Sequence, residues 1–131
     1  MTHSLQLFPA GHFDDSANSP VTLAIANDAD PREADLNGIQ TVLLNFPTFS
    51  DGRAFSQAFL LRRRLGFTGE IRATGDVLVD QLQQMQRSGF SQAVLRADQD
   101  ISLGQELLKL YAAFYQGDAV ATQPRFSNAT V

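Results

Sequence analysis

Short apolar runs that alternate with longer helical patterns constrain the fold of this 131-residue chain more than any other feature. Strands buried on both faces read as aliphatic and β-branched runs between turn residues, and four segments have that form: 21–26, 39–46, 70–74 and 91–97. The last three are each followed by a helical pattern, over 51–65, 76–88 and 100–116. After the first run the sequence allows only a short helical turn near Pro31. The alternation predicts an α/β fold with a small, mainly parallel sheet of about four strands flanked by helices.

One domain accounts for this length. We place it at 21–116, with an irregular N-terminal arm at 1–20 and a C-terminal tail at 117–131, because both ends lack a sustained period. The sequence does not give the strand order. An open sheet and a half-barrel that closes by dimerising both fit the pattern.

Composition removes several classes of function. The chain has no cysteine, so disulfides, thiolate metal sites and thiol nucleophiles are excluded. It has no apolar stretch of about 20 residues and no basic, apolar leader, so we expect a cytoplasmic protein without a membrane anchor. Its net charge of −4 argues against nucleic-acid binding.

The charge is unevenly distributed along the chain. Residues 1–52 carry seven acids and one arginine, residues 53–96 carry seven arginines and three acids, and residues 97–131 carry four acids and two bases. A cationic middle inside an acidic protein indicates a site for an anion or an acidic partner.

The predicted sheet places candidate residues at one edge. Parallel strands end at the same edge, where open α/β sheets bind ligands, so the loops 47–52, 75–76 and 98–100 are expected to meet there. Asp51-Gly52-Arg53 is the preferred oxyanion contact, since glycine lets backbone N–H groups approach and arginine offers two parallel donors. The alternative for these residues is a helix-start turn with a solvent-facing arginine. The aspartates of the three loops either cap helices or converge on a cation: Asp51, Asp76, Asp98 and Asp100.

Two further arginines have open assignments. Arg62 falls in the apolar arc of its helix and is either paired structurally or a ligand contact, with Asp51, Asp76, Asp80 and nearby loop carbonyls as candidate partners. Arg72 lies in a short strand, where an ion-paired structural role is expected.

The motifs that bind cofactors are missing. The chain contains neither the dinucleotide fingerprint nor the phosphate loop, so we expect no cofactor. His3 and His12 lie in the N-terminal arm with no nucleophile or acid cluster beside them, which gives no triad and no assigned metal site. Helix 100–116 has more apolar surface than one sheet contact needs, and the surplus predicts a homodimer or a cover for the N-terminal arm.

The stretch from Phe46 to Phe90 resembles a bacterial family known as domain of unknown function 934. The family pattern is close to F-x-DGR-x-x-S-x-A-x-LLR, GF-x-GE-x-RA-x-GDVL-x-DQ and R-x-GF. In this chain the matching residues are Asp51, Gly52, Arg53, Ser56, Arg62, Glu70, Arg72, Gly75, Asp76, Asp80 and Gln81.

This resemblance implies a role beside assimilatory sulfite reductase, since members look like its companions and have been labelled oxidoreductases from that context. We therefore expect an accessory protein that contacts sulfite reductase or binds a small sulfur oxyanion. Two alternatives stay open: a metal- or phosphate-dependent enzyme of unknown reaction, and a structural dimeric scaffold. The sequence does not decide whether the protein is an enzyme.

Overall fold

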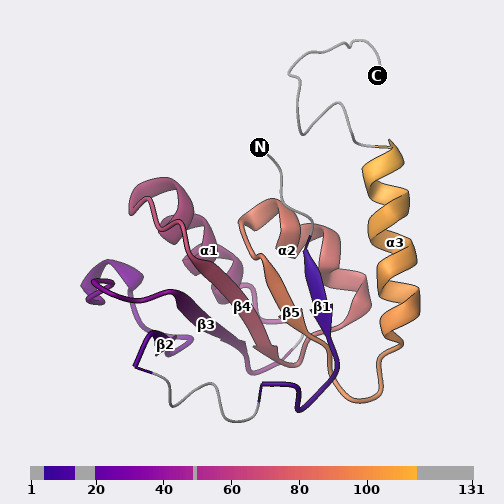
Figure 1. The fold of residues 1–131 in the computed structure, drawn as a ribbon, viewed down its shortest axis with the longest axis horizontal. Coiled ribbons are helices and arrows are strands. Elements are labelled where there is room, and N and C mark those ends of the chain that lie inside the picture. Colours follow the sequence, from indigo (N-terminus) through magenta and orange to yellow (C-terminus); the bar gives the residue numbers. More distant parts are fainter. Residues whose placement is uncertain (1–4, 14–19, 49, 115–131) are drawn as a thin grey trace.

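The computed structural model describes residues 5–13, 20–48 and 50–114. One sheet of parallel strands runs through this part of the chain in the order β1-β5-β4-β3-β2 (Figure 1). Its strands are β1 (Gln6–Phe8), β2 (Thr22–Ile25), β3 (Thr41–Phe46), β4 (Glu70–Gly75) and β5 (Gln92–Val94). The predicted α/β fold with a parallel sheet is confirmed, and the sheet contains one strand more than expected.

The additional strand is β1, which lies within the segment described above as an arm. It pairs with β5 in parallel, with Leu7 opposite Ala93. Its three residues are too few to display an alternating pattern, so the sequence carries no local signal for it. Pairing with a strand more than 80 residues away creates β1, and only the folded chain shows it.

The helices match the predicted ranges. The first consists of α1 (Arg53–Phe59) continued by a π-helical turn, η3 (Leu60–Arg64). The second is a 3-10 turn, η4 (Val79–Gln81), continued by α2 (Leu82–Ser88), and the third is α3 (Ile101–Phe114). The short turn expected near Pro31 is η2 (Pro31–Glu33). Residues 115–116 of the predicted third helix lie outside the described residues. Within the described ranges, no helix has both the length and the apolar character of a membrane span.

The strand order determines where the helices lie. From β2 to β5 each strand adds beside the previous one in the same direction, and right-handed crossovers then place the connecting helices on one face. Figure 1 shows α1 and α2 together on that face and α3 alongside β1. The core between sheet and helices includes Val42, Leu44, Phe46, Ile71 and Leu82, all fully buried.

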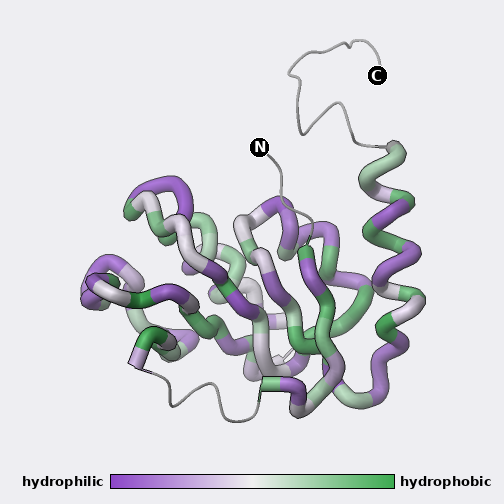
Figure 2. The backbone as a smooth tube through the Cα atoms, viewed as in Figure 1, coloured by the Kyte–Doolittle hydropathy of each residue, from purple (hydrophilic) through white to green (hydrophobic). Residues whose placement is uncertain are grey.

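Apolar surface is left over on α3. Green and purple bands alternate along this helix in Figure 2, as in a helix with one apolar side. Gly104 is buried against Leu7, while Leu103 and Leu110 are about half exposed, at 48% and 50%. The surplus predicted from the sequence is therefore present on α3.

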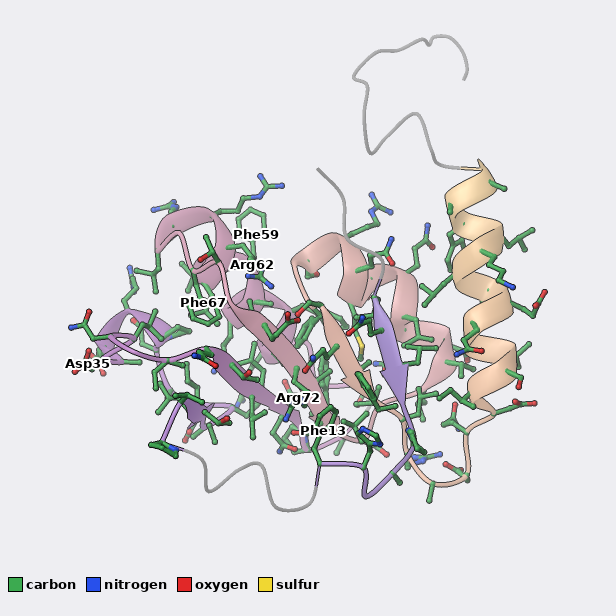
Figure 3. The ribbon with its side chains drawn as sticks, in the orientation of Figure 1. Phe13, Asp35, Phe59, Arg62, Phe67 and Arg72 are labelled. Atoms are coloured by element: carbon green, nitrogen blue, oxygen red, sulfur yellow. The ribbon has the colours of Figure 1, made fainter. Side chains whose placement is uncertain are left out.

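The opposite face of the sheet is partly covered by the turn that follows β1. Phe13 from this turn stacks on the guanidinium of Arg72, and the distance from Arg72 Cζ to the ring centre is 3.5 Å (Figure 3). Arg72 is only 5% exposed. The Nε of Arg72 donates to Gln92 Oε1 at 2.8 Å. Ala24 and Asn45 on the same face remain exposed.

Arg62 joins the helical layer to the sheet. Its Nε donates to the Gly89 carbonyl at 2.9 Å, and its Nη1 donates to the carbonyls of Phe67 and Gly69 at 2.9 and 2.6 Å. These carbonyls precede β4 and β5, so one side chain fixes the entry to two strands. Burial lowers the pKa of Arg62 and the charge of Glu70 opposes that shift, but a guanidinium stays protonated in this setting.

A substitution at Gly89 can test how tightly Arg62 is packed. Gly89 ends α2 with φ +117°, and a Cβ there would meet the Cγ of Arg62 at 2.5 Å. Gly66 is a matched control because it also has positive φ, at +67°, with open space around it. We expect Gly89→Ala to lower the free energy of unfolding by about 2–4 kcal/mol and Gly66→Ala by only about 1 kcal/mol. Urea unfolding measures both, and equal losses would contradict a pinned Arg62.

Candidate functional site

The three predicted loops meet at the carboxyl edge of the sheet. They follow β3, β4 and β5, which are neighbours in the sheet order. The Asp76 amide donates to the Phe46 carbonyl at 2.8 Å, which joins the first two loops. The Asp76 carboxylate binds Arg96, directly after β5, which joins the second to the third. The predicted grouping of these loops is present in the folded chain.

Arg96 holds two of the aspartates at this edge. Its Nη1 lies 2.6 Å from Asp76 Oδ1, while its Nε and Nη2 form a fork on the Asp98 carboxylate at 2.6 and 2.8 Å. The pKa of Arg96 is raised, first by Asp98 and then by Asp76. The same fork lowers the pKa of Asp98 to about 2. We call this group, Asp76, Arg96 and Asp98, the Arg96 brace.

Asp51-Gly52-Arg53 forms the start of α1. Asp51 Oδ1 accepts a hydrogen bond from the Arg53 amide at 3.0 Å, and Gly52 occupies the position just before the helix. The Arg53 side chain is exposed, and its guanidinium forms no hydrogen bond or ion pair with another described residue. The local geometry is a helix-start turn that presents one arginine to solvent. An oxyanion would meet this single guanidinium first.

The remaining edge residues have structural roles or face solvent. Gly75, with φ +91°, passes so close to Asn45 Oδ1 and the Phe46 carbonyl that a side chain does not fit. Gln81 Oε1 accepts from the Leu78 amide at 3.3 Å. Asp80, in the first turn of η4, and Ser56 on α1 are exposed.

Arg62 and Arg72 do not belong to this edge. Arg62 lies at the amino end of the strands, and the carbonyls among its candidate partners are the ones it binds. None of the three aspartates proposed as its partners forms an ion pair with it in the described residues. Arg72 lies on the sheet face opposite the helices, under Phe13. The two residues are separated from each other in Figure 3 as well.

Two side chains that organise this edge had not been singled out from the sequence. Arg96 is one. Its role was hard to infer from the sequence, because its two partners, Asp76 and Asp98, follow different strands. Gln57 is the other: it is buried on α1, and its Nε2 donates to the carbonyls of Ala26, Asn27 and Ala29 at 2.8 to 3.3 Å. Its Oε1 is buried without a hydrogen-bond partner among the described residues. Gln57 therefore fastens the loop after β2 to α1.

The aspartates do not gather into a metal-binding group within the described ranges, where no cluster of three or more histidines and acids is found. Asp100 instead caps α3, since its Oδ1 accepts from the amides of Ser102 and Leu103 at 2.9 and 3.2 Å. In the described loops and helix starts that follow β3, β4 and β5, carboxylates outnumber arginines. Asp51, Asp76, Asp80, Asp98 and Asp100 are accompanied by Arg53 and Arg96.

The cations of the middle segment lie mainly at the opposite end. Helices run antiparallel to the strands they connect, so the last turns of η3 and α2 lie near the amino edge of the sheet. Arg63, Arg64 and Arg87 are exposed there, and Arg63 stacks on Phe59 at 5.0 Å. We call Phe59 with these three arginines the basic end. Cations near helix C-termini are favoured by the helix dipole, as acids are near N-termini.

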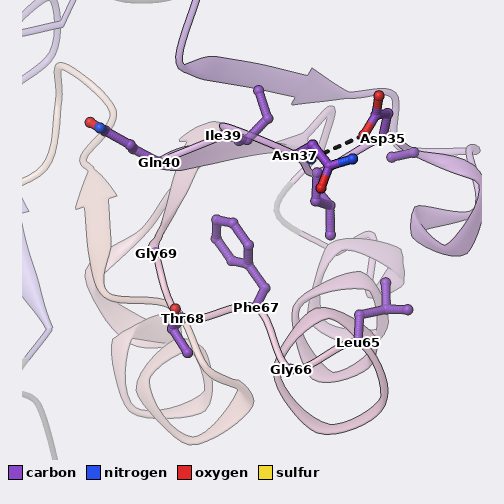
Figure 4. A pocket seen from close by; sticks show the side chains of 11 residues that line it. Asp35, Asn37, Ile39, Gln40, Leu65, Gly66, Phe67, Thr68 and Gly69 are labelled. Carbon is purple, nitrogen blue, oxygen red and sulfur yellow. Dashed lines mark hydrogen bonds between the residues drawn. The ribbon is translucent and has the colours of Figure 1, made fainter.

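A hollow of about 610 Å³ adjoins the basic end (Figure 4). It lies between the loops that lead into β3 and β4, and we call it the amino-edge hollow. Phe67 points into the space between the two loops, toward Ile39. Its lining comprises Ala34, Asp35, Leu36, Asn37, Ile39, Gln40, Leu65, Gly66, Phe67, Thr68 and Gly69.

The fold and these two ends define a parallel α/β protein with acidic and basic poles. A family model described as bacterial protein of unknown function (DUF934) matches residues 20–126, so the chain belongs to that family. No curated protein and no solved structure gives a significant match.

The Arg96 brace predicts an unusual titration. Because Asp98 titrates at about 2 in the folded chain, below its ordinary value of 3.8, its contribution to stability is present above pH 4 and is lost as the pH falls toward 2. We expect Arg96→Gln to return the pKa of Asp98 to roughly 4, measured by carboxyl-carbon NMR. Arg53→Gln is the control at the same edge and should leave this pKa unchanged. A wild-type Asp98 that titrates near 4 would contradict the fork.

Proposed function

We propose that the protein is a cytoplasmic accessory protein of assimilatory sulfite reduction that acts by contact with a partner protein. Family membership and the resemblance described above support the metabolic context. The observation that carries the mode of action is the separation of charge. Three exposed arginines without a carboxylate partner in the described residues lie at the basic end, Arg63, Arg64 and Arg87, whereas Arg53 lies among aspartates at the carboxyl edge.

Partner contact is favoured over oxyanion binding by the state of the carboxyl edge. Arg96 is already engaged by two carboxylates. A sulfur oxyanion arriving there meets Arg53 together with a surplus of aspartate, which repels it. At the basic end the exposed arginines have no carboxylate partners among the described residues, so the local charge is positive. Such a surface is suited to contact with a larger, acidic surface.

Sulfite reductase is the partner proposed from the resemblance. We expect the tagged full-length chain to retain sulfite reductase from a lysate of bacteria grown on sulfate as the sulfur source. Because the contact is electrostatic, retention should fall steeply between about 0.1 and 0.5 M salt. The tag alone on the same matrix is the control. Absence of sulfite reductase even at the lower salt concentration would contradict the proposed partner.

Oxyanion binding at Asp51-Gly52-Arg53 is a second mode of action that we propose, favoured by the exposure of Arg53. With a single guanidinium available we expect weak binding, with a dissociation constant on the order of 1 mM. Sulfite at about 10 mM should then raise the melting temperature by about 4 °C. The shift should disappear in Arg53→Ala and persist in Arg64→Ala, which removes the same charge at the other end. An unchanged wild-type melting temperature would remove this mode.

The homodimer expected from the third helix stays a prediction. Leu103 and Leu110 lie seven residues apart on α3 and are exposed, as a helix-pairing seam requires. The described part of α3 has 14 residues and spans about 21 Å, so one such seam buries less than the roughly 800 Å² per partner of a standard interface. A stable dimer needs additional surface from elsewhere.

A further inference from the structure

We propose that the basic end and the amino-edge hollow together form a docking surface for an acidic protein segment that carries leucine-type side chains. This inference rests on the partner-contact role proposed above and gives it a location. It also names the chemistry of the partner: carboxylates for the arginines and an aliphatic group for the exposed Phe59 and Leu65.

The fold uses only the first arginine of the triplet. Arg62 binds three carbonyls, whereas Arg63 and Arg64 are exposed and have no carboxylate within 4 Å among the described residues. Arg87, in the last turn of α2, has the same surroundings. Since Arg62 contacts Gly89 at the end of α2, the two helix ends lie side by side. Three guanidinium groups therefore occupy one end of the molecule with their hydrogen-bonding capacity unused by described carboxylates.

The helix dipole accounts for the position of these cations, but it does not account for the apolar groups beside them. Phe59 is 47% exposed and Leu65 is 38% exposed. The Arg63 guanidinium lies over the Phe59 ring, which holds it flat against an apolar surface. Exposed aromatic rings combined with arginine are the composition of protein-binding hot spots. Phe59 and Arg62 lie together at this end in Figure 3.

The hollow has a mixed lining of polar and apolar groups, and Leu65 is its exposed apolar residue next to the arginines. Leu65 and Phe67 form one wall and Ile39 the other (Figure 4). Asp35 is the charged residue in the lining, and its Oδ1 accepts from the Asn37 amide at 3.0 Å. Figure 3 shows Asp35 on the same side of the molecule as the helix that carries Arg62, and η2, which lies just before Asp35 in the chain, is in contact with η3. Carboxylates of a bound segment are expected at the exposed guanidinium groups of Arg63, Arg64 and Arg87.

Charge complementarity selects an acidic protein segment. The protein has a net charge of −4 and an acidic carboxyl edge, which oppose the approach of an acidic partner, while the exposed arginines of the basic end attract one. A negatively charged protein with one basic end therefore meets an acidic partner preferentially through that end. A nucleic acid would also meet the arginines, but three phosphate contacts on an acidic protein give weak binding and leave the hollow unused.

NMR titration of the labelled full-length chain tests the surface. The probe is a synthetic peptide of about twelve residues composed of Glu, Asp and Leu. We expect chemical-shift changes at the amides of 59–69 and 86–89 and none at 75–77. The double variant Arg63→Glu, Arg64→Glu should bind the peptide at least about tenfold more weakly. The double variant Arg53→Glu, Asp98→Lys keeps the net charge of the wild type and should change the affinity less than twofold. Arg53→Glu alone is the single-charge control and should weaken binding far less than either arginine reversal at the basic end.

Several results would overturn the proposal. They are the absence of shift changes at 59–69, an equal loss of affinity in Arg53→Glu, and tighter binding at the same residues by a thymidine oligonucleotide of equal length. Replacing leucine by serine in the peptide should weaken binding about tenfold, and no change would rule out the hollow. Circular dichroism confirms that each variant is folded.

The outcomes separate this inference from the proposed function. If the peptide binds at 59–69 but the lysate yields no sulfite reductase, the surface is supported and the proposed partner is wrong. If sulfite reductase is retained equally by the wild type and by the Arg63→Glu, Arg64→Glu variant, the partner is supported and the surface is wrong.

Discussion

The handedness of the connections between parallel strands is the constraint from which the rest of this structure follows. From β2 to β5 every strand is added on the same side of the previous one, so right-handed crossovers place the connecting helices on a single face. All helix starts then lie near the carboxyl edge and all helix ends near the amino edge. Aspartates that cap helix starts and arginines that complete helix ends are thereby carried to opposite poles. Acidic and basic residues that alternate along the chain are therefore separated to two opposite ends of the folded molecule.

Periodicity predicted strands at 39–46 and 70–74, which are observed as β3 and β4, and it predicted the three helices, because each element is long enough to repeat its pattern. It was insufficient where a feature depends on distant partners. The strand β1 has three residues and exists through its pairing with β5. The π-helical turn η3 leaves the apolar spacing almost unchanged, yet it aims Arg62 at the carbonyls that it binds.

The candidate site shows the same division. Topology predicted that the loops after β3, β4 and β5 would meet, because all parallel strands end at one edge. It did not predict that Arg96 would neutralise two of the aspartates gathered there, since those residues are joined only after the strands have paired. The middle segment was correctly identified as cationic. Its arginines, however, are divided in space. Arg62 binds carbonyls, Arg72 is covered on the sheet face, Arg96 is paired with two aspartates, Arg53 is exposed at the carboxyl edge, and three exposed arginines lie together at the basic end.

The cover over Arg72 shows that the family boundary and the folding unit do not coincide. The family match begins at residue 20, whereas β1 and Phe13 precede it. A fragment cut at that boundary loses the strand that shields the edge of β5 and the ring that shields a guanidinium on the sheet face. Such a fragment presents an open strand edge next to an uncovered charge, the arrangement that leads sheet proteins to associate edge to edge. The segment before the matched domain thus covers one edge and part of one face of the sheet that follows it in the chain.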